Sequence, residues 1–189
     1  ATGAENTTYM VDYQSVRFIV LDTTSALNFG TLEAQRDWLR QALDHSDARW
    51  NIVVMHHPLF SCGRNYEPTR IRSTFRTVLE AGGADLVLQG HDHCYSRTSD
   101  PDGGALEPGG RRFTKGPVYV VSIAGSKMYA LNPQSAEQAD VRIGDTQLFQ
   151  VVDVSTDRLT FRTFDATGRR LDAFDIEKSS KGREVIDRR

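Results

Sequence analysis

The feature that most restricts the fold is an alternation of short apolar runs with amphipathic segments over residues 16–89. The runs at 18–21, 50–55 and 85–88 are rich in branched apolar residues, as in strands covered on both faces. Between them, residues 31–45 and 68–81 place apolar side chains at helical spacing. We expect Thr31 to cap the first helix and Pro68 to begin the second. The pattern predicts α/β layering.

The flanking sequence adds further strands. Residues 8–22 predict a strand pair with a turn near Gln14 and Ser15, and residues 96–117 predict a long polar loop. Four more strands are expected at 118–124, 147–154, 158–165 and 171–177, the last three as an antiparallel meander. No domain boundary is visible, so residues 1–189 are expected to form a single domain.

Composition excludes two classes of partner. The chain has 189 residues, of which 39% are hydrophobic and 25% charged, and its net charge is −2. This charge gives no long-range attraction for nucleic acid or an anionic membrane, and no apolar run reaches the roughly 20 residues of a membrane span. The start, ATGAENTTYM, has neither a leader pattern nor an initiator methionine, which indicates trimming or processing and leaves localisation open.

The two cysteines, Cys62 and Cys94, allow two interpretations. Two cysteines do not make a disulfide framework, and free thiols are the favoured expectation. A bridge is possible if the protein is exported, because both residues closely follow histidine clusters and could lie near each other.

Four of the five histidines follow buried strands directly. His56 and His57 come after the run at 50–55, and His91 and His93 come after the run at 85–88. Ligands of α/β sheets collect beyond the carboxyl ends of the strands, and imidazole is a frequent ligand of zinc, iron and manganese. In an extended His-x-His segment both rings would point to one side. A metal site is favoured over ordinary hydrogen-bonded loop histidines, the class to which His45 is assigned.

At these residues the chain resembles the calcineurin-like metallophosphoesterases, especially their purple-acid-phosphatase-like branch. The family motifs V-x-x-H and G-H-x-H-x-Y-x-R correspond to VVMH at 53–56 and GHDHCYSR at 90–97. The resemblance extends over RFIVLDT, LEAQRDWLRQAL and GPVYVVSIAGSKMY, whereas Ser96 departs from the glutamate common in purple acid phosphatases. It implies half of a four-layer αββα sandwich, with a mixed sheet and flanking helices.

The resemblance also implies roles for individual residues. His56 and His91 would share one ion and His93 would bind a second, in a dinuclear centre of iron, zinc or manganese. Such a centre clamps phosphate oxygens and activates water for attack on a phosphate ester. His57 is the sole local candidate for the general acid. Contacts to phosphate or support of the ligands are implied for Arg64, Asn65, Tyr95 and Arg97.

The family motifs D-x-H, G-D-x-x-Y and G-N-H-E/D are absent before Val53. Without their bridging carboxylate, we expect this chain alone to be inactive and to hold at most one ion weakly. The missing half, in the same gene or another chain, or self-association would complete the fold. The alternatives are a non-catalytic α/β interaction module, an inactive remnant and, more weakly, an amidohydrolase, whose His-x-His motif belongs after the first strand of a longer barrel.

Overall fold

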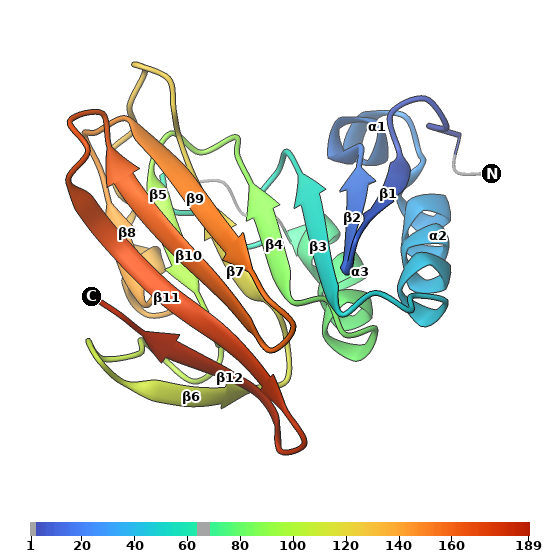
Figure 1. The fold of residues 1–189 in the computed structure, drawn as a ribbon. Helices are drawn as coiled ribbons and strands as arrows, with labels where there is room; N and C mark the ends of the chain where they lie inside the picture. Colours follow the sequence, from blue (N-terminus) through green and yellow to red (C-terminus); the bar gives the residue numbers. More distant parts are fainter. Residues whose placement is uncertain (1–2, 64–68) are drawn as a thin grey trace.

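The computed structural model describes residues 3–63 and 69–189, which form two sheets with helices against one of them (Figure 1). The elements are β1 (Tyr9–Tyr13), β2 (Val16–Leu21), α1 (Thr23–Asn28), α2 (Leu32–Asp44), β3 (Trp50–Met55), α3 (Thr69–Ala81), β4 (Leu86–Gln89), β5 (Tyr95–Thr98), β6 (Arg111–Thr114), β7 (Val118–Val121), the 3-10 helix η1 (Pro133–Ala136), β8 (Val141–Ile143), β9 (Leu148–Val154), β10 (Arg158–Asp165), β11 (Arg170–Ser179) and β12 (Gly182–Asp187).

The larger sheet has seven strands in the order β1-β2-β3-β4-β7-β5-β8. Its centre, β2-β3-β4-β7, is parallel, while β1, β5 and β8 pair antiparallel with their neighbours. Helices α2 and α3 are the connections that parallel pairing requires. The mixed α/β architecture expected from the sequence is therefore confirmed.

Alternating side chains of the central strands build two cores. In β3, Val53 and Met55 pack with α2 and α3, whereas Trp50 and Ile52 pack against the smaller sheet. In β4, Val87 likewise packs in the core on the helix side, whereas its neighbours Leu86 and Leu88 pack in the core on the side of the smaller sheet. Burial on both faces explains the continuous apolar runs, and the result is three stacked layers: helices, seven-stranded sheet and five-stranded sheet.

The smaller sheet has the order β6-β12-β11-β10-β9 and is antiparallel throughout. It contains the expected meander, formed by β9, β10 and β11. Two of its strands, β6 and β12, were not expected. β6 falls within the predicted polar loop at 96–117, which β5 also enters, so that interpretation of the segment was wrong. β6 became a strand because its backbone pairs with β12, a contact distant in sequence.

Cys62 and Cys94 form a disulfide, and no free cysteine occurs in the described residues. The favoured expectation of two free thiols was therefore wrong. Sequence offers no measure of the separation between loops 32 residues apart, whereas the fold places their Cα atoms 6.3 Å apart, within bridging range. In the described residues, no helix is sufficiently long and apolar to span a membrane.

Candidate metal centre

The histidines converge because they extend two adjacent parallel strands. β3 ends at Met55 and β4 at Gln89, and the amide of Gly90 donates to the carbonyl of His56 at 3.0 Å, one step beyond the ladder. Each strand thus delivers its histidine to the same edge of the sheet. As expected, the first cluster meets the second beyond the strand ends, but only through His91.

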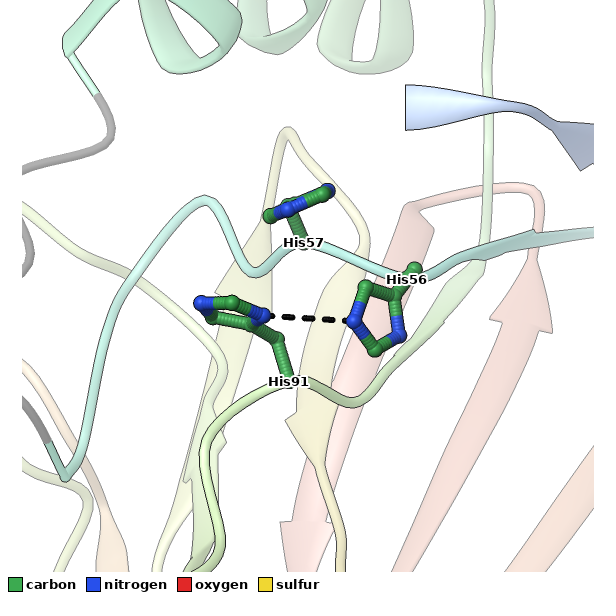
Figure 2. A group of neighbouring side chains, drawn as sticks. All are labelled: His56, His57 and His91. Carbon is green, nitrogen blue, oxygen red and sulfur yellow. Dashed lines mark hydrogen bonds between the residues drawn. The ribbon is translucent and has the colours of Figure 1, made fainter. Parts of the chain in front are cut away.

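Three imidazoles form the group: His56, His57 and His91 (Figure 2). One ligand nitrogen from each lies within 4.8 Å of the other two. His56 Nε2 and His91 Nδ1 face each other at 3.2 Å, and the ring centroids of His57 and His91 are 4.6 Å apart. The His56 side chain is exposed and the other two are half-buried, so the group is open to solvent.

The orientation of His57 is set by Thr23, at the start of α1. The Thr23 hydroxyl accepts the backbone N–H of His57 at 3.0 Å and lies 2.9 Å from its Nδ1. β2 and β3 are adjacent parallel strands, with Leu21 opposite Met55. Thr23 and His57 each lie two residues beyond these paired residues, so they leave the sheet side by side. Thr23 is fully buried. When its single proton is given to Nδ1, the ring proton stays on Nε2.

The environment favours the neutral form of His57. Burial foremost, and then the charges of His91 and His56, lower its pKa from 6.5 to about 4, while Asp22 acts in the opposite direction. The side chain is therefore a neutral hydrogen-bond donor at neutral pH.

His91 occupies an unusual backbone conformation, with φ of 66°. The amide of Asp92 donates to the carbonyl of Gly90 at 2.7 Å, so a three-residue turn is centred on His91. The segment is thus bent and not extended, and the expectation of an extended His-x-His was wrong. A non-glycine residue at positive φ is uncommon and persists where its surroundings hold it there.

His93 lies outside the group of three imidazoles because of this turn. Its ring stacks on Tyr129, with centroids 4.3 Å apart and planes inclined by 15°. Its Nδ1 is buried and has no hydrogen-bond partner among the described residues. The structure therefore brings together two of the three predicted ligands and adds His57, which was predicted as a candidate general acid and not as a ligand.

The residues predicted to contact phosphate divide into two pairs. Arg64 and Asn65 lie outside the described residues. Tyr95 and Arg97 are fully buried between the sheets: the Tyr95 hydroxyl donates to Asp172 at 2.7 Å, and Arg97 pairs with Asp172 and Asp187. A side chain without exposed surface cannot reach a substrate, so this geometry does not favour the predicted contact for either.

The distances between the ring nitrogens of the group test whether it can hold a cation. Two nitrogens bound at about 2.0–2.1 Å to one tetrahedral ion are separated by roughly 3.3 Å. The 3.2 Å between His56 Nε2 and His91 Nδ1 matches that edge. The contact is a hydrogen bond between the two rings, and at this spacing one ion could take the place of the proton that they share. In the described part of the chain the group contains no carboxylate that could bridge a second.

Two contributors to the site were missed in the sequence. Thr23 has no motif, although its place just after a buried strand, like that of His56, was a usable signal. Asp92 would point away from both rings in the expected extended segment, but its carboxylate is buried and accepts three hydrogen bonds from the loop after His57.

Comparison with known proteins identifies relatives. Residues 6–95 match the calcineurin-like phosphoesterase family. Purple acid phosphatase 17 of Arabidopsis thaliana is 31% identical over 50% of this chain and 33% of its own length. Purple acid phosphatase 4 of the same plant is 25% identical over 90% of this chain and 52% of its own. The chain thus spans a third to a half of the length of these relatives.

Solved structures that share the fold include the following two. A purple acid phosphatase from yellow lupin (Lupinus luteus) seeds superposes with a TM-score of 0.73 at 19% identity, covering 92% of this chain and 33% of that one. GAP50 of Plasmodium, described as the anchor in the inner membrane complex, gives 0.63 at 18% identity, covering 87% and 52%. Both likenesses concern the sandwich architecture alone.

Proposed function

We propose that the complete protein hydrolyses phosphoric esters at a dinuclear metal centre, because residues 6–95 match the calcineurin-like phosphoesterase family and the chain is similar to purple acid phosphatases. The observation that supports this most directly is the facing pair His56 Nε2 and His91 Nδ1, at a separation suited to one cation. The wider comparison agrees, since the curated relatives are phosphatases.

We assign His56 and His91 to one ion of iron, zinc or manganese. His93 is assigned to the second ion, with its buried Nδ1 as an available ligand atom if the ring leaves Tyr129. When bound, such ions polarise phosphate oxygens and lower the pKa of water.

In this proposal His57 serves the substrate and not a metal. With Nδ1 engaged by Thr23, the protonated Nε2 can donate a hydrogen bond to a phosphate oxygen or to the leaving group. The lowered pKa of about 4 means that His57 acts as a full proton donor only in acidic solution. At neutral pH its contribution is orientation and charge stabilisation.

Completion of the centre requires ligands from elsewhere. Three imidazoles supply no negative charge to hold two cations together, so this chain alone is proposed to hold at most one ion weakly. The edge strand β9 exposes Phe149, Val151, Val152 and Val154. We propose that the missing first half, or a second copy, covers this edge. Sedimentation of the chain at several concentrations separates these sources, since a second copy would give a concentration-dependent dimer.

The competing reading is a non-catalytic interaction module of the same fold. The phosphatase from lupin and the Plasmodium anchor protein share this architecture. The fold alone therefore does not distinguish an enzyme from an interaction module. We favour the enzyme because His56 Nε2 and His91 Nδ1 lie 3.2 Å apart, a spacing suited to a shared cation.

The test uses the complete protein and a chromogenic phosphate monoester. His91→Ala and His93→Ala are each expected to lower turnover by more than a hundredfold while the circular dichroism spectrum is unchanged, because each removes a proposed ligand. His45→Ala is the matched control, since that ring lies at the end of α2 and bonds the carbonyl of Gln41. Turnover near the wild-type level in either ligand variant would refute the assignment.

A further inference from the structure

Asp92 separates two predicted ligands in sequence but turns its carboxylate away from them. The side chain is completely buried. Its Oδ2 accepts the hydroxyl of Ser61 at 2.6 Å and the amides of Cys62 and Gly63 at 2.7 and 3.0 Å. All three donors belong to the loop that follows His56 and His57. One carboxylate oxygen therefore joins the two histidine-bearing loops.

A covalent bond joins the same two loops. Cys62, whose amide bonds Asp92, is bridged to Cys94, two residues beyond Asp92. The contact is close: a Cβ added at Gly63 would lie 2.9 Å from Cys94 Sγ and 3.3 Å from Tyr129 Cβ. Only glycine fits at this position without displacing the disulfide.

We infer that Asp92 is a positioning residue that sets the affinity of the histidine group for its cation. Together with the Cys62–Cys94 disulfide it forms a clamp, which holds His91 at its positive φ so that Nδ1 faces His56. A carboxylate oxygen suits this role because it accepts bonds from three donors at once, and an amide oxygen in its place would accept them less strongly. The inference rests on the proposed function, in which His56 and His91 bind one ion.

A structural role alone is the competing explanation, and the chain offers a matched control. Asp140 is also a buried carboxylate that joins two loops, accepting the amides of Ser99 and Leu106 at 2.9 and 2.7 Å. It does not belong to the histidine group. Asp140→Asn should therefore reduce stability through the same chemistry without altering the histidines.

The experiment titrates the chain, its Asp92→Asn variant and its Asp140→Asn variant with Co²⁺, following the visible absorption of the bound ion. We expect Asp92→Asn to weaken binding about tenfold, the lower end of the effect of residues that orient metal ligands. Asp140→Asn should bind as the wild type does. Equal affinity of all three proteins, with both variants less stable to urea, would overturn the inference.

A second readout does not depend on the ion. Nuclear Overhauser contacts between the rings of His56 and His91 should be present in the wild type and in Asp140→Asn, and lost in Asp92→Asn. If the wild-type chain binds no Co²⁺, the assignment of one ion to His56 and His91 in this chain fails, while these contacts still decide about the clamp: their persistence in Asp92→Asn overturns it. Should Asp92→Asn not fold, Ser61→Ala removes one donor only, and unchanged contacts and affinity would again overturn the inference.

Discussion

At the scale of single residues, the chemistry of the histidines is determined by neighbours that carry no recognisable motif. His57 and His56 are adjacent in sequence, yet Thr23 holds the first while the second faces His91. The depressed pKa of His57 follows from its burial and from the two other imidazoles. Identical side chains thus have different roles because the backbone delivers them to different partners.

Removal of the Thr23 hydroxyl tests this arrangement. Thr23→Val preserves the shape but leaves the amide of His57 without its acceptor, so the free energy of unfolding should fall by about 1–3 kcal/mol. Thr23→Ser retains the hydroxyl and should lose distinctly less. Urea denaturation of the two variants provides the comparison, and equal stability of Val and Ser variants would show that the hydroxyl bonds contribute nothing.

At the scale of elements, the helices and strands predicted from local sequence pattern agree with the structure. The helical spacing of Leu32, Leu39 and Leu43 and the apolar run at 50–55 correspond to α2 and β3 as observed. The approach of His56 to His91 was predictable because adjacent parallel strands end at one edge. Pro68, expected to begin the second helix, lies outside the described residues, and α3 is described from Thr69.

Features that depend on distant contacts were not predictable. β6 exists through its pairing with β12, some 70 residues later, and its sequence alone is polar. The disulfide and the Asp92 bonds likewise depend on the separation of loops that only the assembled sheet sets. At His91 the structure has a turn where an extended segment was expected. The turn was not predictable, because a three-residue turn leaves no pattern in the spacing of side chains.

The turn between β10 and β11 permits a prediction about pH. Asp165 accepts bonds from the hydroxyl and amide of Thr167 and from the amide of Arg169, and chiefly the Thr167 hydroxyl lowers its pKa from 3.8 to about 2. A pKa lower in the folded state stabilises the protein above pH 3.8, and this contribution is lost as the pH falls to 2. Asp165→Asn should therefore show a shallower loss of stability in that range, measured by urea denaturation. Parallel curves would contradict the assignment.

At the scale of the whole molecule, three layers bring the site to one edge and leave other edges uncovered. Helices and the five-stranded sheet enclose the central strands, whereas β1 and β9 stand at sheet edges with exposed apolar side chains such as Tyr13 and Phe149. The chain spans a third to a half of the length of its relatives. These exposed edges are the surfaces that a partner would cover in the proposed complete protein.

The central claim is that imidazoles from two loops share one cation, and calorimetric titration of the chain with Zn²⁺ tests it most directly. The account predicts weak binding of no more than one equivalent, abolished by His56→Ala and by His91→Ala and retained in His45→Ala. Binding of two equivalents at micromolar concentration, or undiminished binding in the His91→Ala variant, would contradict it.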